Sequence, residues 1–178
     1  AARLLATGRT RVDEVIETYD GAYRAPGRRN PIRDVHRAPA MTVADIMRHS
    51  SNVGIVRLAE RMTPAEQYEA LRDAGFGMAT GVPFPSEAAG RLPMPHQWSL
   101  TTPAALAMGY EIGVTPLQLA NAYAAIANGG ELLEPALVKE IRSPDGDVVY
   151  AHRPRAVRRV YDEETTRVLV SMLESVVD

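Results

Sequence analysis

The sequence predicts an α+β fold built from about six helices and one β-hairpin. Two observations carry this prediction. Helix-capping residues followed by apolar residues at helical spacing recur along the chain, and two short apolar runs, residues 137–141 and 147–150, flank the turn-forming residues 143–146. The composition, 46% hydrophobic and 24% charged, agrees with a folded globular protein.

The N-terminal part of the chain is predicted to be irregular after one short helix. Residues 1–6 read as the last turns of a helix that stops at Gly8. Residues 10–40 contain several glycines and prolines, so we expect mostly loop with short strands near residues 12–18. A loop of this length inside a compact domain is usually functional or lies over a neighbouring segment.

Two helices are predicted on either side of residues 50–52. The first begins at Thr42, whose hydroxyl can cap it, and Asp45 stands where a capping box has its acidic residue. The second helix has apolar residues at the spacing i, i+3, i+4 and i+7, namely Ile55, Leu58, Ala59 and Met62.

Three helix starts in the middle of the chain contain threonine followed by proline. Residues 63–66 and 115–118 read as capping boxes with proline at the first helical position, and residues 101–103 open a shorter helix. Residues 81–95 are rich in proline and glycine and are predicted to be irregular. The helix that starts at residue 115 is apolar on nearly all faces, so it is predicted to be buried until residues 128–130 end it.

The last helix is predicted to begin at Asp162, a cap residue followed by two glutamates, and to run to Asp178. Because residues 1–6 begin within a helix and no residue follows Asp178, we expect residues 1–178 to be part of a longer domain.

Charge and residue content argue against several functional classes. Lysine plus arginine total 20 and aspartate plus glutamate total 22, so the chain does not have the basic character of a nucleic-acid binder. The absence of cysteine excludes a disulfide framework, a thiolate zinc site and a cysteine nucleophile. None of the four histidines has metal-ligand spacing: they are His36, His49, His96 and His152.

Ser50, Ser51 and Asn52 are the candidate functional residues between the two predicted helices. Taken alone, this tripeptide is most simply a helix cap, because serine and asparagine both cap helices well. His49 beside Ser50 suggests a nucleophile and base, but adjacent residues on a helix do not face each other, so this pairing is discounted.

The surrounding residues favour a functional interpretation. Five stretches in matching order and spacing resemble the transpeptidase domain of class B penicillin-binding proteins, most closely the division-specific septal type: residues 50–54 (Ser-Ser-Asn-Val-Gly), 75–77 (Gly-Phe-Gly), 81–87 (Gly-Val-Pro-Phe-Pro-Ser-Glu), 109–120 (Gly-Tyr-Glu-Ile-Gly-Val-Thr-Pro-Leu-Gln-Leu-Ala) and 127–130 (Ala-Asn-Gly-Gly). The resemblance covers roughly residues 42–178.

This resemblance implies a penicillin-binding transpeptidase or serine β-lactamase-like fold, of which this chain supplies most of the helical lobe and a hairpin. Ser50 and Asn52 would form the middle of three catalytic motifs. Ser51 and Tyr110 are expected to contact substrate. Four residues are also candidates to line or brace the cleft, namely Ser86, Glu87, Trp98 and Tyr110. For each of them the alternative, a purely structural role, is favoured.

The other two motifs do not occur in these 178 residues. No serine has a lysine three residues later, and the single lysine, Lys139, is followed by Glu140 rather than by Thr-Gly. The resemblance therefore implies that residues 1–178 are a partial domain, cut between the nucleophile motif and the Lys-Thr-Gly strand. Such a piece is predicted to be inactive alone.

The implied activity is that of a D,D-transpeptidase, which cross-links peptidoglycan stem peptides by serine acyl transfer and is acylated by β-lactams. No metal and no organic cofactor are implied. The expected partners are stem peptides, β-lactams and cell-division membrane proteins, without nucleic acid. The expected location is the inner membrane, with the catalytic domain in the periplasm or outside the cell and the anchor beyond this chain. The alternatives are a β-lactamase or D,D-carboxypeptidase relative and a non-catalytic penicillin-sensing or interaction module.

Overall fold

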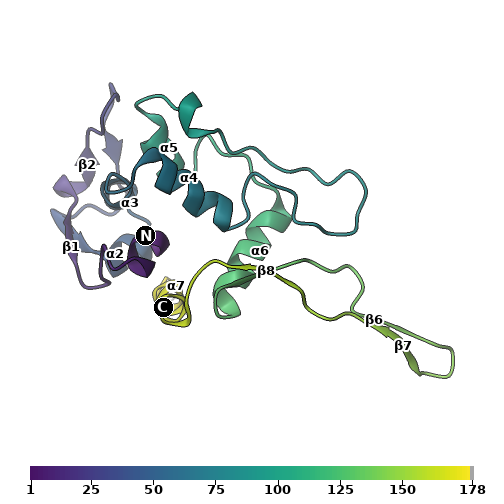
Figure 1. The fold of residues 1–178 in the computed structure, drawn as a ribbon. Helices are drawn as coiled ribbons and strands as arrows, with labels where there is room; N and C mark the ends of the chain where they lie inside the picture. Colours follow the sequence, from purple (N-terminus) through teal and green to yellow (C-terminus); the bar gives the residue numbers. More distant parts are fainter. Residues whose placement is uncertain (177–178) are drawn as a thin grey trace.

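A computed structural model describes residues 1–176, in which seven α-helices form a body and a two-stranded ribbon projects from it (Figure 1). The helices are α1 (Ala2–Ala6), α2 (Val43–Arg48), α3 (Asn52–Ala59), α4 (Pro64–Asp73), α5 (Thr102–Ala107), α6 (Pro116–Ala127) and α7 (Glu163–Glu174). Two 3₁₀ turns, η1 (Tyr19–Gly21) and η2 (Pro95–Gln97), lie in the loops. In this described part of the chain, no helix has the length and hydropathy of a transmembrane span.

The helix starts follow the predicted caps. Thr42, Thr63 and Thr115 each accept a hydrogen bond from the N–H three residues later and complete a capping box. Asp162 caps α7 by accepting from the Thr165 N–H at 2.7 Å. The prediction carried α7 to Asp178, but the helix ends at Glu174; Val177 and Asp178 lie outside the described residues.

The strands form four antiparallel pairs within residues 1–176. These pairs are β1 (Val15–Glu17) with β4 (Ala40–Thr42), β2 (Ala22–Tyr23) with β3 (Ile32–Arg33), β5 (Glu131–Leu133) with β8 (Ala156–Arg159), and β6 (Glu140–Arg142) with β7 (Val148–Ala151). The predicted hairpin is confirmed as β6 with β7, and β1 lies where a short strand was expected. The other three pairs were not predicted, because β1–β4 and β5–β8 join strands far apart in the sequence and β2 and β3 have only two residues each.

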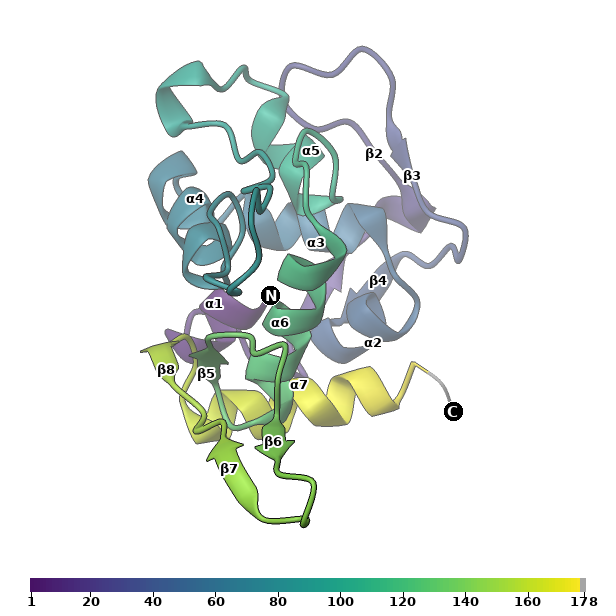
Figure 2. The same ribbon diagram turned by 90° about the vertical axis from the view of Figure 1, so that its right-hand side faces the viewer.

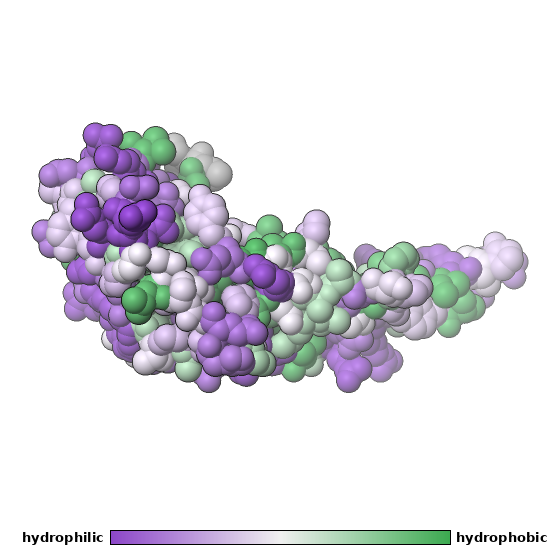
Figure 3. All heavy atoms as spheres, turned by 90° about the horizontal axis from the view of Figure 1, so that it is seen from above, coloured by the Kyte–Doolittle hydropathy of each residue, from purple (hydrophilic) through white to green (hydrophobic). Residues whose placement is uncertain are grey.

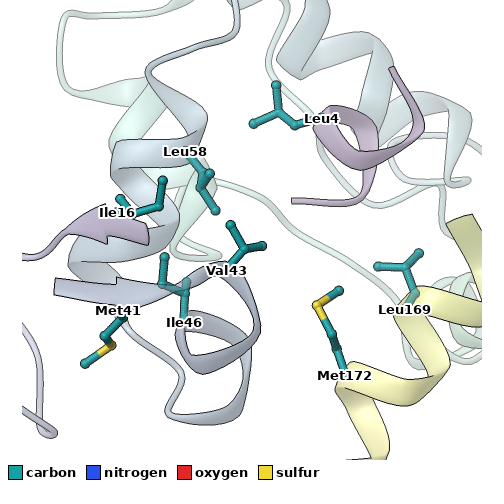
Figure 4. Close-up of a cluster of buried hydrophobic side chains, with 8 residues drawn as sticks. All are labelled: Leu4, Ile16, Met41, Val43, Ile46, Leu58, Leu169 and Met172. Atoms are coloured by element: carbon teal, nitrogen blue, oxygen red, sulfur yellow. The ribbon is translucent and has the colours of Figure 1, made fainter. Parts of the chain in front are cut away.

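The main core joins segments that are far apart in the sequence. Figure 4 shows side chains from α1, the β1–β4 pair, α2 and α3 gathered with two from α7. Figure 2 shows α7 crossing below the body, where it packs against α1, α2 and α6. Burial of each large aliphatic side chain contributes roughly 1.5–3 kcal/mol. The cluster consists of Leu4, Ile16, Met41, Val43, Ile46, Leu58, Leu169 and Met172.

Helix α6 is not buried as predicted. Leu117, Leu119 and Tyr123 are 37%, 45% and 55% exposed, although Gln118 and Ala125 face the interior. A helix that is apolar on all faces needs neighbours on all sides, and the described residues supply them mainly through β5 and α7. Composition indicates that a helix favours burial, but it does not identify the segments that would cover it.

Candidate active site

The turn between α2 and α3 brings the three candidate residues together in one short segment. The Ser50 N–H donates to Met47 O at 3.2 Å and the Ser51 N–H donates to Ile46 O at 2.9 Å, which closes the end of α2. Ser50 has a φ of +51°, a left-handed conformation that is uncommon for residues with a side chain. Its side chain is exposed, so Ser50 is accessible to a ligand.

Ser51 faces the interior rather than a ligand. It is 2% exposed, its Oγ accepts from the Gly54 N–H at 2.8 Å, and its hydroxyl donates to Asp34 Oδ2 at 2.6 Å. Ser51 is therefore the N-cap of α3. The expected substrate contact of Ser51 does not fit this geometry, because its hydroxyl is engaged within the protein.

Asn52 is the first residue of α3 and its side chain is only partly covered. Its Nδ2 lies 3.5 Å from Arg33 O, a long contact that leaves the amide available for other partners. Ser50 and Asn52 thus stand on either side of a residue that points inward. The side chains of Ser50 and Asn52 are therefore accessible to a ligand, whereas that of Ser51 stabilises the turn.

Asp34 is the residue of this site that the sequence did not reveal. It lies between β3 and β4, is 6% exposed, and its Oδ1 accepts from the Val53 N–H at 2.9 Å. The sequence contains one indirect indication of its role, namely that a loop as long as residues 10–40 is usually functional or lies over a neighbouring segment. Its contact with α3 links residues 17 to 19 positions apart, a separation that local patterns do not report.

Two histidines stack beside the turn. The rings of His36 and His49 are 4.1 Å apart with an interplanar angle of 13°, and both side chains are exposed. Within residues 1–176, no hydrogen bond joins His49 to Ser50. In the same residues, no group of three or more His, Cys, Asp or Glu is placed to hold a metal ion.

Tyr110 lies in the connection between α5 and α6. Its N–H donates to Ala105 O at 2.9 Å, and its side chain is 65% exposed. The neighbouring Gly109 and Glu111 have φ values of +85° and +60°, which produces a tight turn. Because α5 packs against α3, this turn belongs to the same side of the body as the helix that carries Asn52. None of the hydrogen bonds found for residues 1–176 joins Tyr110 to Ser50 or Asn52.

Glu87 and Trp98 have structural partners. The Glu87 carboxylate accepts from the Thr80 hydroxyl at 2.6 Å, the Thr80 N–H at 2.7 Å and the Gly81 N–H at 3.2 Å. The hydrogen bond from the Thr80 hydroxyl is the main reason that the pKa of Glu87 is lowered. Trp98 Nε1 donates to Pro93 O at 2.9 Å. These contacts agree with the favoured structural roles, whereas Ser86 is exposed and has a φ of +63°.

Gln118 completes the predicted capping box of α6, and the structure adds contacts of its side chain that the sequence did not reveal. Its Nε2 donates to Met78 O at 2.7 Å and to Ala89 O at 2.8 Å, while its Oε1 accepts from the Thr115 N–H at 2.9 Å. The side chain is fully buried. It therefore ties two points of the irregular segment after α4, Met78 and Ala89, to the start of α6.

Comparisons with known proteins agree on one family. Residues 1–178 match the family described as penicillin binding protein transpeptidase domain. Penicillin-binding protein PbpB of Mycolicibacterium smegmatis is 37% identical over 179 residues, covering 99% of this chain and 27% of that protein. Peptidoglycan D,D-transpeptidase FtsI of Escherichia coli is 32% identical over 173 residues, covering 97% of this chain and 27% of that protein.

Solved structures show the same fold. The crystal structure of penicillin binding protein 3 from Mycobacterium tuberculosis, complexed with aztreonam, superposes with a TM-score of 0.86 at 34% identity. The match covers 99% of this chain and 39% of that one. This chain thus spans about a quarter of the length of the two relatives named above.

Proposed function

The chain belongs to the family of penicillin-binding protein transpeptidase domains, and from this premise we propose that residues 1–178 are the middle part of a longer catalytic domain. The nucleophile motif would precede residue 1 and the Lys-Thr-Gly strand would follow residue 178. The partial coverage of the relatives supports the first part of this proposal, that residues 1–178 belong to a longer protein. It also accounts for the exposed apolar side chains of α6, which the rest of the domain would cover.

We propose that the longer protein is a peptidoglycan D,D-transpeptidase. The observation that carries this proposal is the turn at residues 50–52, where Ser51 is fixed inward while Ser50 and Asn52 remain accessible. A turn between two packed helices places both groups on rigid elements, as catalytic positioning requires.

In the proposed reaction, a serine hydroxyl attacks the amide carbonyl of a D-Ala-D-Ala stem peptide. A serine is a weak nucleophile until a base accepts its proton. Ser50 passes that proton to the nitrogen of the departing D-alanine, and the carbon–nitrogen bond breaks to leave an acyl-enzyme. Asn52 binds a substrate carbonyl and the catalytic lysine through its amide. The nitrogen of an amine from a neighbouring stem peptide then attacks the acyl carbonyl. The new amide bond forms as the ester bond to the nucleophilic serine breaks, and a proton from the amine returns to the serine oxygen.

The proposed ligands and setting follow from the named relatives. Structures of penicillin binding protein 3 in complex with aztreonam and ampicillin support β-lactams as acylating ligands. We also propose a role in septal synthesis with cell-division membrane proteins as partners, because the motifs between residues 50 and 130 resemble the division-specific type. We place the protein at the inner membrane with its catalytic domain outside the cytoplasm. Tyr110 is proposed to contact the substrate.

A β-lactamase or carboxypeptidase with water as acceptor is not favoured, because named relatives are peptidoglycan D,D-transpeptidases. A non-catalytic penicillin-sensing module is not favoured for the same reason.

Labelling with fluorescent penicillin tests the proposal. The longer protein should form a covalent adduct, residues 1–178 alone should not, and a stem-peptide assay should show cross-linked product. Asn52→Ala in the longer protein should slow acylation by about 100- to 1000-fold, as for loss of one preorganised donor. An unlabelled longer protein, or normal acylation in Asn52→Ala with normal folding, would contradict the proposed activity or the proposed role of Asn52.

A further inference from the structure

Asp34 is a buried carboxylate that the proposed reaction does not use. It is 6% exposed, and its N–H donates to Gly21 O at 2.9 Å. A buried carboxylate is unfavourable unless hydrogen bonds or a cation compensate for its lost hydration. Asp34 takes part in none of the ion pairs of residues 1–176. Hydrogen bonds must therefore compensate for its burial.

Both carboxylate oxygens of Asp34 accept hydrogen bonds from the turn. Oδ2 accepts from the Ser51 hydroxyl at 2.6 Å, and Oδ1 accepts from the Val53 N–H at 2.9 Å. Both donors lie at the N-terminus of α3, where free N–H groups and the helix dipole favour a negative charge. Asp34 thus caps α3 from a distant segment, in addition to the cap that Ser51 provides.

The single proton of the Ser51 hydroxyl determines the direction of this network. Because Ser51 donates to Asp34, its oxygen lone pairs are free to accept from the Gly54 N–H at 2.8 Å. Together the two bonds hold Ser51 inward. They also orient its neighbours in the chain, Ser50 and Asn52, towards the outside.

Ser50 depends on this support because its own backbone is unfavourable. A φ of +51° is sparsely populated for a residue with a Cβ and persists only where surrounding structure holds it. The bonds to Asp34 begin one residue after Ser50 and fix the following backbone. Their loss would leave Ser50 free to relax towards a more common conformation.

We propose that Asp34 is a positioning residue, which holds Ser51 and the start of α3 so that Ser50 and Asn52 face the reacting groups. This inference rests on the proposed transpeptidase function and deepens it. Asp34 acts through Ser51 and the Val53 N–H, and it touches no substrate.

The test measures β-lactam acylation of the longer protein and separates the rate constant at saturation from the dissociation constant of the non-covalent complex. Asp34→Ala should lower the rate constant about 10- to 100-fold, since small misplacements of catalytic groups have effects of this size. The dissociation constant should change less than about threefold, because Asp34 does not contact the ligand. Asp34→Asn keeps an acceptor for Val53 and should recover part of the rate.

Two controls separate positioning from general destabilisation. Asp13→Ala removes an exposed carboxylate that pairs with Arg11 at the surface and should acylate at the wild-type rate. Leu169→Ala destabilises the core from α7 without removing any hydrogen bond of the turn, and it should lower thermal stability without a comparable loss of rate. A Leu169→Ala variant as slow as Asp34→Ala would overturn the positioning role.

A double variant tests whether Asp34 acts through Ser51. Ser51→Ala should itself slow acylation, and Asp34→Ala with Ser51→Ala should be no slower than Asp34→Ala alone, within about twofold, because both remove one connected network. If the rate losses of the two single variants multiplied in the double variant, Asp34 would not act through Ser51. If Asp34→Ala does not fold, Asp34→Asn and Ser51→Ala still provide the measurement.

Acylation of the wild type and of Asp34→Ala distinguishes a failure of the transpeptidase function from a failure of the Asp34 role. A wild-type protein that is not acylated would overturn the transpeptidase function. Normal wild-type acylation together with an unchanged rate constant in folded Asp34→Ala would overturn only the role of Asp34.

Discussion

The turn at residues 50–52 and the β6–β7 ribbon represent opposite ways of placing side chains. At the turn, Ser51 and Asp34 are buried and hydrogen-bonded, and α3 packs on the main core. Along the ribbon, every residue of β6 and β7 is exposed, including Ile141 at 51%. Figure 3 shows the ribbon as a narrow arm on which apolar groups lie among polar ones.

The difference concerns what holds each region in place. The ribbon is anchored at its base, where Leu132 is buried and Arg158 reaches Asp73 at 3.8 Å, but its tip has only the pairing of its own strands. The turn is held by segments from several parts of the chain. A region that must orient reactive groups benefits from the second arrangement, because locked neighbours keep side chains within a narrow range of positions. The following substitutions test this contrast in the longer protein.

Leu58→Ala should have the largest effect on stability. Leu58 is fully buried on α3 in the main core, so its truncation should cost about 2–5 kcal/mol of unfolding free energy. Urea denaturation measures the change. A cost below about 1 kcal/mol would mean that α3 is not held by this core, against the contrast drawn above.

Gly54→Ala should come next. A Cβ at Gly54 would overlap Ile46 Cγ1, so the added methyl group would push α2 and α3 apart. Overpacking of this kind should cost about 1–3 kcal/mol and should also slow acylation, because the turn joins these two helices. Thermal unfolding and penicillin labelling measure the two effects. Gly113→Ala, whose φ is not positive and whose Cβ would meet Arg91 at an ordinary 3.5 Å, is the matched control without overpacking.

Glu14→Gln should produce a smaller, pH-dependent effect. Hydrogen bonds from Arg61 chiefly, and from Thr10, lower the pKa of Glu14 from its usual 4.5 to about 2. Because the folded-state pKa is the lower one, this stabilisation is fully present above pH 4.5 and is lost as the pH falls through about 2.

The pair is one third exposed, so the loss at pH 7 should not exceed about 1 kcal/mol. The Glu14→Gln variant should also lose less stability than the wild type between pH 7 and pH 3, measured by urea denaturation at both values. An equal loss in the two proteins would rule out the contribution of Glu14. Glu140→Gln, in the exposed ribbon pair with Arg142, is the matched substitution.

Ile141→Ala should have the smallest effect, below about 0.5 kcal/mol, because the side chain is half exposed at the ribbon and buries little area. Urea denaturation of this variant beside Leu58→Ala compares an exposed with a buried aliphatic residue. A cost near that of Leu58→Ala would show that the ribbon is covered in the longer protein, and the contrast would then apply to this chain alone.

Local sequence patterns predicted much of the fold and two residues of the candidate site, Ser50 and Asn52. The capping boxes at Thr42, Thr63 and Thr115 depend on residues three positions apart, so the sequence shows them directly. The hairpin around residues 143–146 is likewise local. Ser50 and Asn52 were identified because motifs on both sides of the turn match a family.

Within the described residues, α6 is not buried as predicted, and the role of Asp34 was not foreseen. Both depend on which distant segments come into contact. Ser51 illustrates the same limit, since its type is equally suited to a helix cap and to a substrate contact, and only its inward orientation distinguishes them.

By itself, the sequence determined where the helices begin, where the turns lie and to which family the chain is similar, because caps, turn residues and motifs act over a few positions. Only the tertiary structure decided that Ser51 points inward, that Asp34 holds it, and that the ribbon projects from the body. The physical reason is that hydrogen bonds such as the one from Ser51 to Asp34 join residues that chain folding brings together, 17 positions apart in this case.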